Sequence, residues 1–598
     1  NFQPVEETAL NDMLVTKEFN ILTSWMTSEG TVKKEMLQQD EFNILSYIQS
    51  RGYADARVRI DIEEVESRLG YPRVDIIITL ERGPRYSFGT LSFDGNSVFA
   101  DEDIHSLFKM EEGGSFSPDA MRDTVRCISD TYGRKGFIDA YVTFEPKLRR
   151  SEAVYDVHFH IVEGDQYRVG MIKVYGNTST YNQVILHETL LIPGEVFNTD
   201  KLQKTEQRLR NIGYFECVNV YAVRSEEEDC CDPGAPKFRD VHIEVDERST
   251  GDFTFSFGYS TSEAGFGGLS FSERNFDICG VPCLWDEGYG AIRGGGQYFS
   301  ARANFGSRNQ TYNLSWTEPY WRDTDWAVGV DFDKSHYQSG GNAYAVDAHG
   351  AAVHATYTLN QFLKYSWHYR IRHTDVDLGD VRNPSPQLID EANNSGLISG
   401  TGMSLMYDST NHPAAPSCGF RSRLSAEYVG LGGTHTFFNL GYLNSLYYSP
   451  EPCVVMKFRG DARFIAPVGD TTLASLPIDE RFFLGGEGSI RGFDHYGIGP
   501  RYSNGDPRGG LTLLLCSAEY VWKYFKMADF YTFVDTGTLS AGRFSFEEDW
   551  RTSVGLGARL YVFPGGPPLT LGWAWPMNTA PNDKVPESRF FLTLGGRF

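Results

Sequence analysis

The sequence has no excess of basic residues and no long apolar run, and each shortage excludes a class of protein. Its 55 Lys and Arg stand against 79 Asp and Glu, a formal net charge of -24. No cluster of Lys and Arg could neutralise phosphates, so nucleic acid binding is not expected. No run of about 20 apolar residues occurs, which excludes a membrane-spanning helix. A membrane β-barrel remains possible, because only every second residue of its strands must be apolar.

Glycine and aromatic residues, in contrast, are abundant. The 598 residues include 61 Gly, 41 Phe and 33 Tyr. A membrane barrel uses glycine at turns and close strand approaches, and aromatic residues in girdles at the two membrane surfaces. The length is too great for one ordinary domain, so we expect several. The mean hydropathy of -0.36 therefore averages over dissimilar parts.

The nine cysteines do not predict a metal site, because no second Cys or His pair stands at ligand spacing. Cys279 and Cys283 enclose Gly-Val-Pro in a connection rich in Gly, Pro and Asp. This spacing permits a disulfide in an oxidising compartment, and free thiols are the alternative. No nucleophile elbow, phosphate loop or metal cluster is found, so we expect neither an enzyme nor a cofactor.

A sequence motif that occurs twice divides the first 250 residues into repeats. Residues 74–96 read VDIIITLERGPRYSFGTLSFDGN, and residues 155–177 read YDVHFHIVEGDQYRVGMIKVYGN. The alignment that matches Gly83 with Gly164 also matches the Gly-Asn pairs that end both segments. Chance does not keep so many positions in register, so the sequence predicts structural repeats.

Between the two copies of this motif, residues typical of helices complete the repeating unit. Ser117-Pro118 is an N-cap followed by proline at the first helical position, and Met121, Val125 and Ile128 follow at helical spacing. Each unit therefore reads strand, helix, helix, strand, strand, with helices on one face of a small sheet. We expect a partial unit at residues 1–85 and complete units at 86–165 and 166–248. No signal peptide precedes Asn1, so we expect the sequence to begin after processing or inside a longer protein.

After Arg248 the helical periodicity gives way to alternating strands that run to Phe598. In the last strand, residues 590–598, Phe590 and Leu592 share an apolar face opposite Thr593 and Arg597. Arginines also recur on the inward faces of other predicted strands. A water-filled lumen tolerates arginines there, whereas the buried core of a soluble protein does not. At about 22 residues per strand with its connection, residues 249–598 predict a transmembrane barrel of roughly 16 antiparallel strands.

One long connection between barrel strands, residues 485–500, is rich in glycine and in specific side chains. Its Arg491 stands between small residues, and a guanidinium folded into the lumen needs an acidic partner. Glu519 and Asp535 follow on inward strand faces. The alternative is an exposed loop arginine with unrelated acids on the strands.

These features together resemble the BamA superfamily of outer-membrane assembly factors. The repeats resemble its POTRA domains, and the segment Ile490, Arg491, Gly492 and Phe493 resembles the loop 6 motif of the family. Glu519 and Asp535 fall where family members place the partners of that arginine. The sequence departs from the family in having Ile490, where valine is commoner, and in the long segment around Cys279 and Cys283.

The resemblance implies a protein of the bacterial outer membrane with its N-terminal repeats in the periplasm. Its function would be to fold and insert β-barrel proteins, without nucleotide, through a lateral seam between the first and last barrel strands. Implied partners are unfolded client barrels, periplasmic chaperones, outer-membrane lipoproteins of an assembly complex, and lipid. A related translocation and assembly module or a two-partner secretion pore is the alternative. The expected seam residues are Phe253, Phe255, Phe257, Leu594, Gly595, Gly596 and Phe598.

Overall fold

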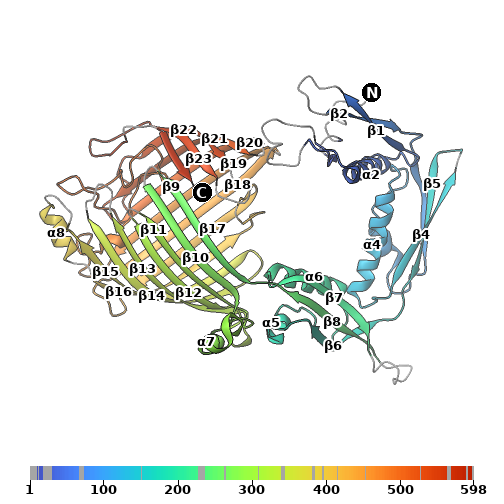
Figure 1. Cartoon of the computed structure of the whole chain (residues 1–598), viewed down its shortest axis with the longest axis horizontal. Coiled ribbons are helices and arrows are strands. Elements are labelled where there is room, and N and C mark those ends of the chain that lie inside the picture. Colours follow the sequence, from blue (N-terminus) through green and yellow to red (C-terminus); the bar gives the residue numbers. More distant parts are fainter. Residues whose placement is uncertain are drawn as a thin grey trace. The chain divides into compact units, whose positions relative to one another are not determined.

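The computed structural model describes residues 10, 13–17, 30–65, 73–149, 151–225, 236–260, 264–306, 309–338, 344–379, 384–393, 396–413, 415–451, 453–525, 527–561, 568–586 and 590–594. The chain divides into two compact units. One contains residues 1–177 and 188–247, and the other contains residues 178–187 and 248–598 (Figure 1). None of the helices described is long and apolar enough to cross a membrane.

The N-terminal part contains the repeated unit that the sequence predicts. One copy consists of β3 (Ser87–Asp94), α3 (Asp101–Ser106), α4 (Pro118–Arg134), β4 (Tyr141–Arg149) and β5 (Val154–Val162). The next consists of β6 (Tyr167–Tyr175), α5 (Asn182–His187), α6 (Thr199–Ile212), β7 (Phe215–Arg224) and β8 (Lys237–Glu247). The last strand of each copy lies in the middle of its sheet, in the orders β3-β5-β4 and β6-β8-β7. Before them stand α2 (Lys34–Ser50), β1 (Arg57–Val65) and β2 (Arg73–Glu81).

The repeated Gly-Asn pairs have a steric cause. Gly95 and Gly176 follow β3 and β6 and have φ of 87° and 86°, a region that other residues rarely adopt. A Cβ on Gly95 would lie 2.0 Å from the carbonyl oxygen of Ile161, and one on Gly176 would lie 2.1 Å from that of Val245. Only glycine therefore fits where the first strand of each unit leaves the central strand.

A carboxylate fixes the turn after Gly95 in the first complete unit. Glu163 accepts hydrogen bonds from the backbone N–H groups of Ser97 and Val98, at 2.6 and 2.9 Å, and from the Tyr132 hydroxyl at 2.7 Å. Partial burial acts to raise the pKa of Glu163, but these hydrogen bonds outweigh it and lower the pKa to about 2. Burial of the Tyr132 ring in the core of the unit raises the pKa of Tyr132, and the hydrogen bond to Glu163 raises it further.

The Glu163 network predicts acid lability of this unit. A depressed pKa in the folded state means that the carboxylate stabilises the fold above the ordinary pKa of 4.5 and that this contribution is lost as the pH falls toward 2. We expect the loss to be about 1 kcal/mol, since the side chain is partly exposed. Amide hydrogen exchange at Ser97 and Val98, corrected for intrinsic rates, should show weaker protection at pH 3 than at pH 6. In Glu163→Gln that difference should largely disappear, and an undiminished difference would contradict the assignment.

The second unit is an antiparallel β-barrel of 16 strands among the residues described, which confirms the predicted fold class. Its strands are β9 (Gly251–Ser260), β10 (Ala264–Phe276), β11 (Gln297–Gly306), β12 (Asn309–Glu318), β13 (Trp326–Gln338), β14 (Ala345–Thr358), β15 (Leu363–Asp377), β16 (Leu397–Asp408), β17 (Gly419–Val429), β18 (Phe437–Glu451), β19 (Val454–Pro467), β20 (Thr512–Phe525), β21 (Ala528–Ser540), β22 (Arg551–Leu560), β23 (Leu569–Pro576) and β24 (Phe590–Leu594). Each strand from β9 to β24 pairs with the next, and β24 returns to β9.

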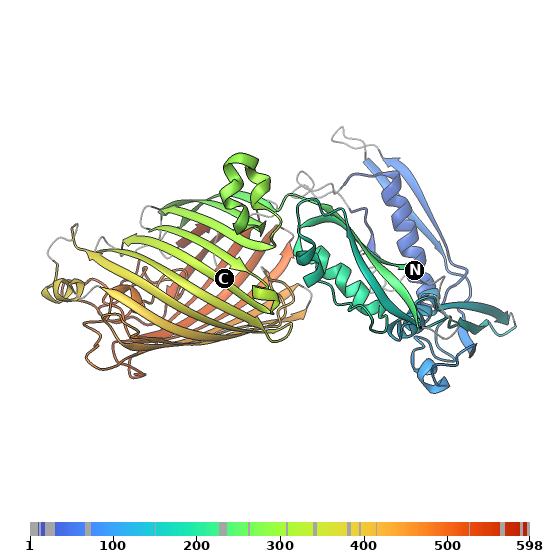
Figure 2. The ribbon, with the colours of Figure 1, turned by 90° about the horizontal axis from the view of Figure 1, so that it is seen from below.

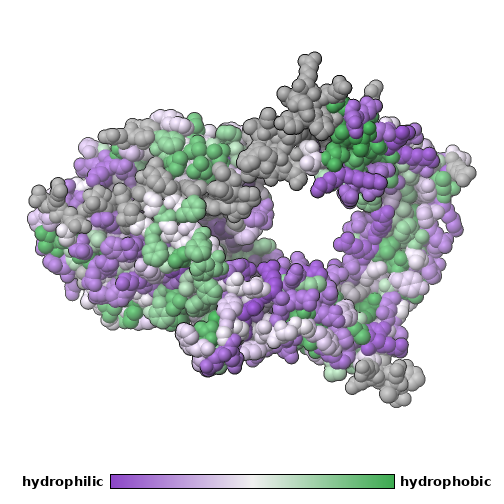
Figure 3. Space-filling view, viewed as in Figure 1, coloured by the Kyte–Doolittle hydropathy of each residue, from purple (hydrophilic) through white to green (hydrophobic). Residues whose placement is uncertain are grey.

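Side chains alternate between the lipid side and the lumen, as the period of two predicts. Phe253, Phe255 and Phe257 on β9 are exposed on the outer face. In Figure 3, hydrophobic residues cover much of the wall formed by the first barrel strands, whereas hydrophilic residues gather toward the end of the barrel at the left of the view. The outer wall therefore presents an apolar surface to lipid.

The thiols of Cys279 and Cys283 are free and exposed in the structure, which corresponds to the second of the two alternatives that their spacing left open. Residues 278–292 fold into η2 (Ile278–Cys283), α7 (Leu284–Glu287) and η3 (Gly288–Ile292). A helical turn carries the chain forward between the two cysteines, whereas a bridged loop would turn it back. The glycine and proline between the two cysteines are compatible with a helical turn and with a bridged loop.

Candidate functional site

The long connection between β19 and β20 folds against the inside of the barrel. Its apolar residues form a small core with residues of β20 and β21, made of Leu484, Ile490, Phe493, Ile498, Leu513, Leu515 and Leu539. Gly492 has φ of 87°, and a Cβ there would lie 3.0 Å from Cβ of Ala574. Glycine therefore lets the backbone of the loop approach β23 closely, which carries the neighbouring Arg491 to the wall.

Arg491 is 6% exposed and is held by two acids that are themselves buried. Its Nε and Nη2 donate to the two carboxylate oxygens of Asp535, each at 2.7 Å, and its Nη1 donates to Glu519 at 2.5 Å. The backbone N–H of Arg491 also donates to Asp535, and Ser517 Oγ donates to the same carboxylate. This planar, bidentate arrangement suits a guanidinium and not an ammonium group. We call Arg491, Asp535 and Glu519 the lumen clamp.

Aromatic rings and a second arginine complete the surroundings of the clamp. The Arg491 guanidinium lies 3.5 Å from the ring centroid of Phe533, and the Arg559 guanidinium lies 4.2 Å from that of Tyr531. Arg559 also donates to Glu519 at 2.7 Å. These contacts leave the charge of Glu519 compensated by two cations, as a buried carboxylate requires.

Glycines make room for these rings on the neighbouring strands. A Cβ on Gly555 would lie 2.3 Å from the Phe533 ring, and one on Gly572 would lie 2.7 Å from the Phe591 ring. Phe533 and Phe591 meet edge to face, with ring centroids 6.3 Å apart. The lumen clamp is thus linked through Phe533 to Phe591 of β24, the closing strand.

The beginning of the same connection is fixed to a different part of the wall. η5 (Ile478–Glu480) brings Glu480 to Arg370 of β15, with both carboxylate oxygens 2.8 Å from guanidinium nitrogens. Arg370 also pairs with Glu427 of β17. Asp479 accepts from Thr374 at 2.9 Å. Here the acids are on the loop and the arginine is on the wall, whereas in the lumen clamp the arginine is on the loop and the acids are on the wall.

A third ionic group joins this connection to the one between β15 and β16. Glu391 lies in α8 (Pro386–Ala392) and accepts from Arg481 and Arg508, each at 2.6 Å. The Tyr502 hydroxyl donates to the same carboxylate at 2.7 Å. The connection is therefore fixed at its beginning, middle and end by buried ion pairs.

Among the residues that the structure describes, the first and last strands share fewer residue pairs than neighbouring strands of the barrel do. β9 pairs with β10 from Ser260–Ala264 to Gly251–Glu273 without interruption. β24 pairs with β9 at the single pair Thr593–Ser260 within the part of the chain described. The other edge of β24 pairs with β23 from Trp573–Phe590 to Leu569–Leu594. One pair leaves most backbone groups of β9 without a partner on this side among the residues described.

The β19–β20 connection also touches the closing strand directly. The Thr593 hydroxyl donates to Glu487, so the residue that forms the seam pair also binds the loop. Nearby, the backbone of Lys584, in the segment between β23 and β24, exchanges hydrogen bonds with Asp494 and Gly497, at 3.0 and 2.9 Å. The loop thus holds both β24 and the segment that leads into it.

The structure brings together the residues that the sequence proposed for the loop motif and its partners, namely Ile490, Arg491, Gly492, Phe493, Glu519 and Asp535. Phe253, Phe255 and Phe257 lie on β9, with their side chains on the outer face. The backbone of Leu594 ends β24, while Gly595, Gly596 and Phe598 lie outside the residues described. No group of His, Cys, Asp and Glu suited to a metal occurs in the described part of the chain.

Sequence reasoning missed Arg370, Glu427, Glu480 and Glu487. The acidic pair Asp479-Glu480 just before the motif was a usable signal, because adjacent acids in a loop that enters a lumen also need cations. Its partner Arg370 is 110 residues away, and nothing local to the sequence identifies it.

Comparison with known families identifies the barrel. Residues 292–598 match the model of the Omp85 superfamily domain. The chain belongs to the Omp85 superfamily. Residues 86–164 and 167–248 match the surface antigen variable number repeat, or POTRA, model. This Omp85 protein is therefore an outer-membrane barrel protein with periplasmic POTRA repeats.

Individual relatives agree with this assignment. The chain is 26% identical to the outer membrane protein assembly factor BamA of Nitratidesulfovibrio vulgaris, over 99% of this chain and 72% of that protein. It is 22% identical to BamA of Neisseria meningitidis serogroup B, over 96% of this chain and 74% of that protein. The crystal structure of BamA from Haemophilus ducreyi lacking POTRA domains 1-3 has the same fold, with a TM-score of 0.69 and 18% identity over 85% of this chain and 99% of that one.

The lumen clamp predicts a large stability loss when its arginine is removed. Arg491→Ala leaves Asp535 and Glu519 buried with less compensation, and breaking a buried pair in this way costs about 3 to 5 kcal/mol. Arg491→Lys keeps the charge without the planar fork, so we expect an intermediate loss. The temperature at which the folded barrel loses its faster migration on a gel should fall in the order wild type, Lys, Ala.

The matched control is Arg423→Ala, because this arginine is exposed and its guanidinium contacts the Met406 sulfur at 3.7 Å. That variant should keep the wild-type transition. Equal transitions for Arg491→Ala and Arg423→Ala would contradict the role assigned to the lumen clamp.

Proposed function

We propose that this Omp85 protein folds β-barrel proteins and inserts them into the outer membrane through the seam between β9 and β24, without nucleotide. The observation that carries the proposal is the seam itself, where the described residues of β9 and β24 form one residue pair, whereas β9 and β10 are paired along the whole of β9. The relatives named as assembly factors support the same role.

The physical reason for a seam lies in the backbone of the client. A strand that enters lipid must have its N–H and C=O groups paired, because no water is present to satisfy them. An unpaired strand edge, which soluble proteins avoid as a template for unwanted pairing, is here the useful feature. Once Thr593 and Ser260 separate, β9 shares no residue pair with the described part of β24 and offers such an edge.

The lumen contacts determine which strand moves. β9 is bound along its other edge to β10, and β24 is bound to β23 through its described residues 590–594. β24 is also held from inside by Phe591 and by the hydrogen bond from Thr593 to Glu487. We infer that β24 leaves while β9 stays, and that the lumen clamp sets the energy of this opening by positioning Phe533.

The repeats offer the second set of client contacts. In each complete unit the strand order places β4 or β7 at one edge of the sheet, whereas the first residues of β3 and β6, at the other edge, are already bonded to residues 113–116 and 194–197. An extended client segment can add to such an edge through main-chain hydrogen bonds. We propose that these edges receive clients from periplasmic chaperones, and that accessory lipoproteins also bind the repeats. Chemistry on a substrate plays no part in this role, so we propose that the protein is not an enzyme.

Locking the seam tests the proposal. Ser260→Cys with Thr593→Cys places cysteines at the one registered pair, and paired positions in antiparallel strands lie about 4.5 to 5.5 Å apart, within disulfide range. The variant should be made in a background without the native cysteines. Oxidised protein in liposomes should stay folded but lose most of its ability to accelerate folding of an unfolded client barrel, and reduction should restore it.

Two controls separate locking from damage. Thr593→Cys alone reports the loss of its hydrogen bond to Glu487, and a cysteine pair at Gly267 and Phe257 locks β9 to β10, which are paired at these positions already. Both should remain active under oxidation. Full activity of the oxidised Ser260–Thr593 protein would overturn the proposed seam.

A further inference from the structure

The connection between β10 and β11 forms a surface that the assembly role leaves unexplained. It is the segment around Cys279 and Cys283, which precedes the residues that match the Omp85 model, and it folds into η2, α7 and η3. Figure 2 shows this bright green helical segment standing out from the outside of the barrel wall. A strand connection in a barrel needs only a few residues, so its length calls for a reason.

The segment lies on the outer face of the barrel, at the foot of the seam strand. Gly251 on β9 shares a face with Phe253 and is paired with Glu273 of β10. The Tyr289 hydroxyl donates to the Glu273 carboxylate, and a Cβ on Gly251 would lie 2.0 Å from that hydroxyl oxygen. Tyr289 therefore lies on the same face as Phe253.

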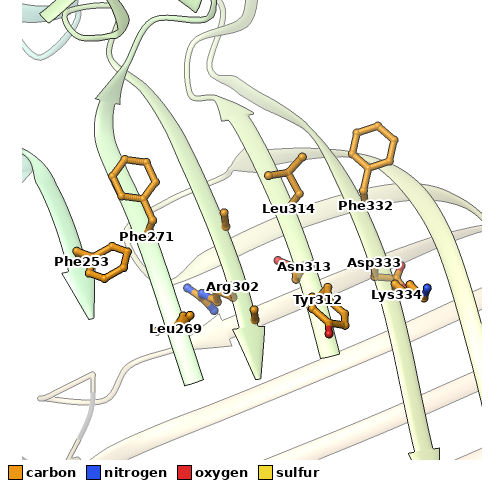
Figure 4. Close-up of a pocket in the computed structure, with 12 residues that line it drawn as sticks. Phe253, Leu269, Phe271, Arg302, Tyr312, Asn313, Leu314, Phe332, Asp333 and Lys334 are labelled. Atoms are coloured by element: carbon orange, nitrogen blue, oxygen red, sulfur yellow. The ribbon is translucent and has the colours of Figure 1, made fainter. Parts of the chain in front are cut away.

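Apolar side chains continue upward from this point along the wall. Phe253 and Phe271 form a registered pair of β9 and β10 and line a hollow in the outer surface together with Leu314 and Phe332 (Figure 4). Beside the segment, Phe276 stacks on Phe299 with ring centroids 4.8 Å apart. The helical segment is thus continuous with the surface that faces lipid.

The segment is held rigidly at its base. The backbone N–H of Asp277 donates to Ile292 at 2.8 Å, and the Asp277 carboxylate accepts from Cys279 at 2.9 Å. A Cβ on Gly280 would lie 1.7 Å from the Ala291 carbonyl oxygen, so η2 and η3 are in direct backbone contact. Side chains on this segment are consequently displayed in a fixed direction.

The side chains that it displays are apolar and aromatic. Trp285 is 92% exposed, and Ile278, Val281 and Tyr289 are exposed as well. Tryptophan and tyrosine favour the boundary between lipid headgroups and water, where the ring is desolvated while its polar atom stays hydrated. Such a group of apolar residues exposed to water marks an interaction site.

The charges on the segment restrict the kind of lipid that it can bind. Residues 278–292 contain Asp286 and Glu287 and no Lys or Arg, so anionic lipid is not attracted electrostatically. We propose that residues 278–292 form a membrane foot, which inserts Trp285 and its apolar neighbours into the headgroup region of zwitterionic phospholipid at the periplasmic membrane surface. Through Tyr289 the foot is bonded to Glu273 of β10 and lies against Gly251 at the lower end of β9. This proposal depends on the location of the barrel in the membrane and not on the assembly function.

Native cysteines allow a direct test with spin labels. Three proteins each keep one exposed cysteine, Cys283 in the foot, Cys453 in the turn between β18 and β19, or Cys516 on the outer face of β20. Each is labelled in the full chain, reconstituted in phosphatidylcholine liposomes, and probed with oxygen and with a water-soluble nickel chelate. We expect the ratio of oxygen to nickel accessibility at Cys283 to be severalfold higher than at Cys453 and lower than at Cys516.

A second variant tests the tryptophan itself. Trp285→Ser in the Cys283 protein should shift the ratio toward that of Cys453, while Asp286→Ser should leave it unchanged or raise it. Circular dichroism and heat-modified gel migration show whether each variant remains folded. A label at Cys283 that is as accessible to nickel as the label at Cys453, in folded protein, would overturn the proposal.

Discussion

The pairing of backbone groups in lipid is the constraint on which this structure depends. Every strand from β10 to β23 satisfies it on both sides, but the described residues of β9 and β24 meet at a single pair. A barrel with so weak a joint needs another source of closure. The interior supplies one, because Phe591 and Thr593 of the closing strand are held by Phe533 and Glu487.

Buried ions suit this task because they fix position more than they add stability. An ion pair moved out of water regains little more than its desolvation cost, but a displaced member is severely penalised. Arg491 between Asp535 and Glu519 therefore permits one arrangement of the loop and disfavours others. The pairs of Glu480 with Arg370 and of Glu391 with Arg481 do the same for its other segments. The closing strand is thus positioned by a loop that is itself fixed at several points.

Much of this architecture could be predicted from local sequence. Gly83 and Gly164 marked the repeats, because their backbone has positive φ, and period-two alternation marked the barrel. Arg491 and its acids followed from a motif. The partnership of Glu480 with Arg370 could not be predicted, since it joins residues 110 apart. Nor could the single seam pair, because strand register at a closure is set by the whole barrel. The helices at residues 278–292 were missed because Gly and Pro indicated a loop.

Contacts inside the barrel, and not strand pairing across the seam, would then position β24. Pulsed electron-electron resonance tests it, with one spin label at Leu592 on β24 and one at Phe257 on β9, in liposomes without client. We expect a narrow distance distribution in the wild-type background and a markedly broader, longer one with Arg491→Ala, in protein that still migrates as a folded barrel. An identical narrow distribution in both proteins would contradict it.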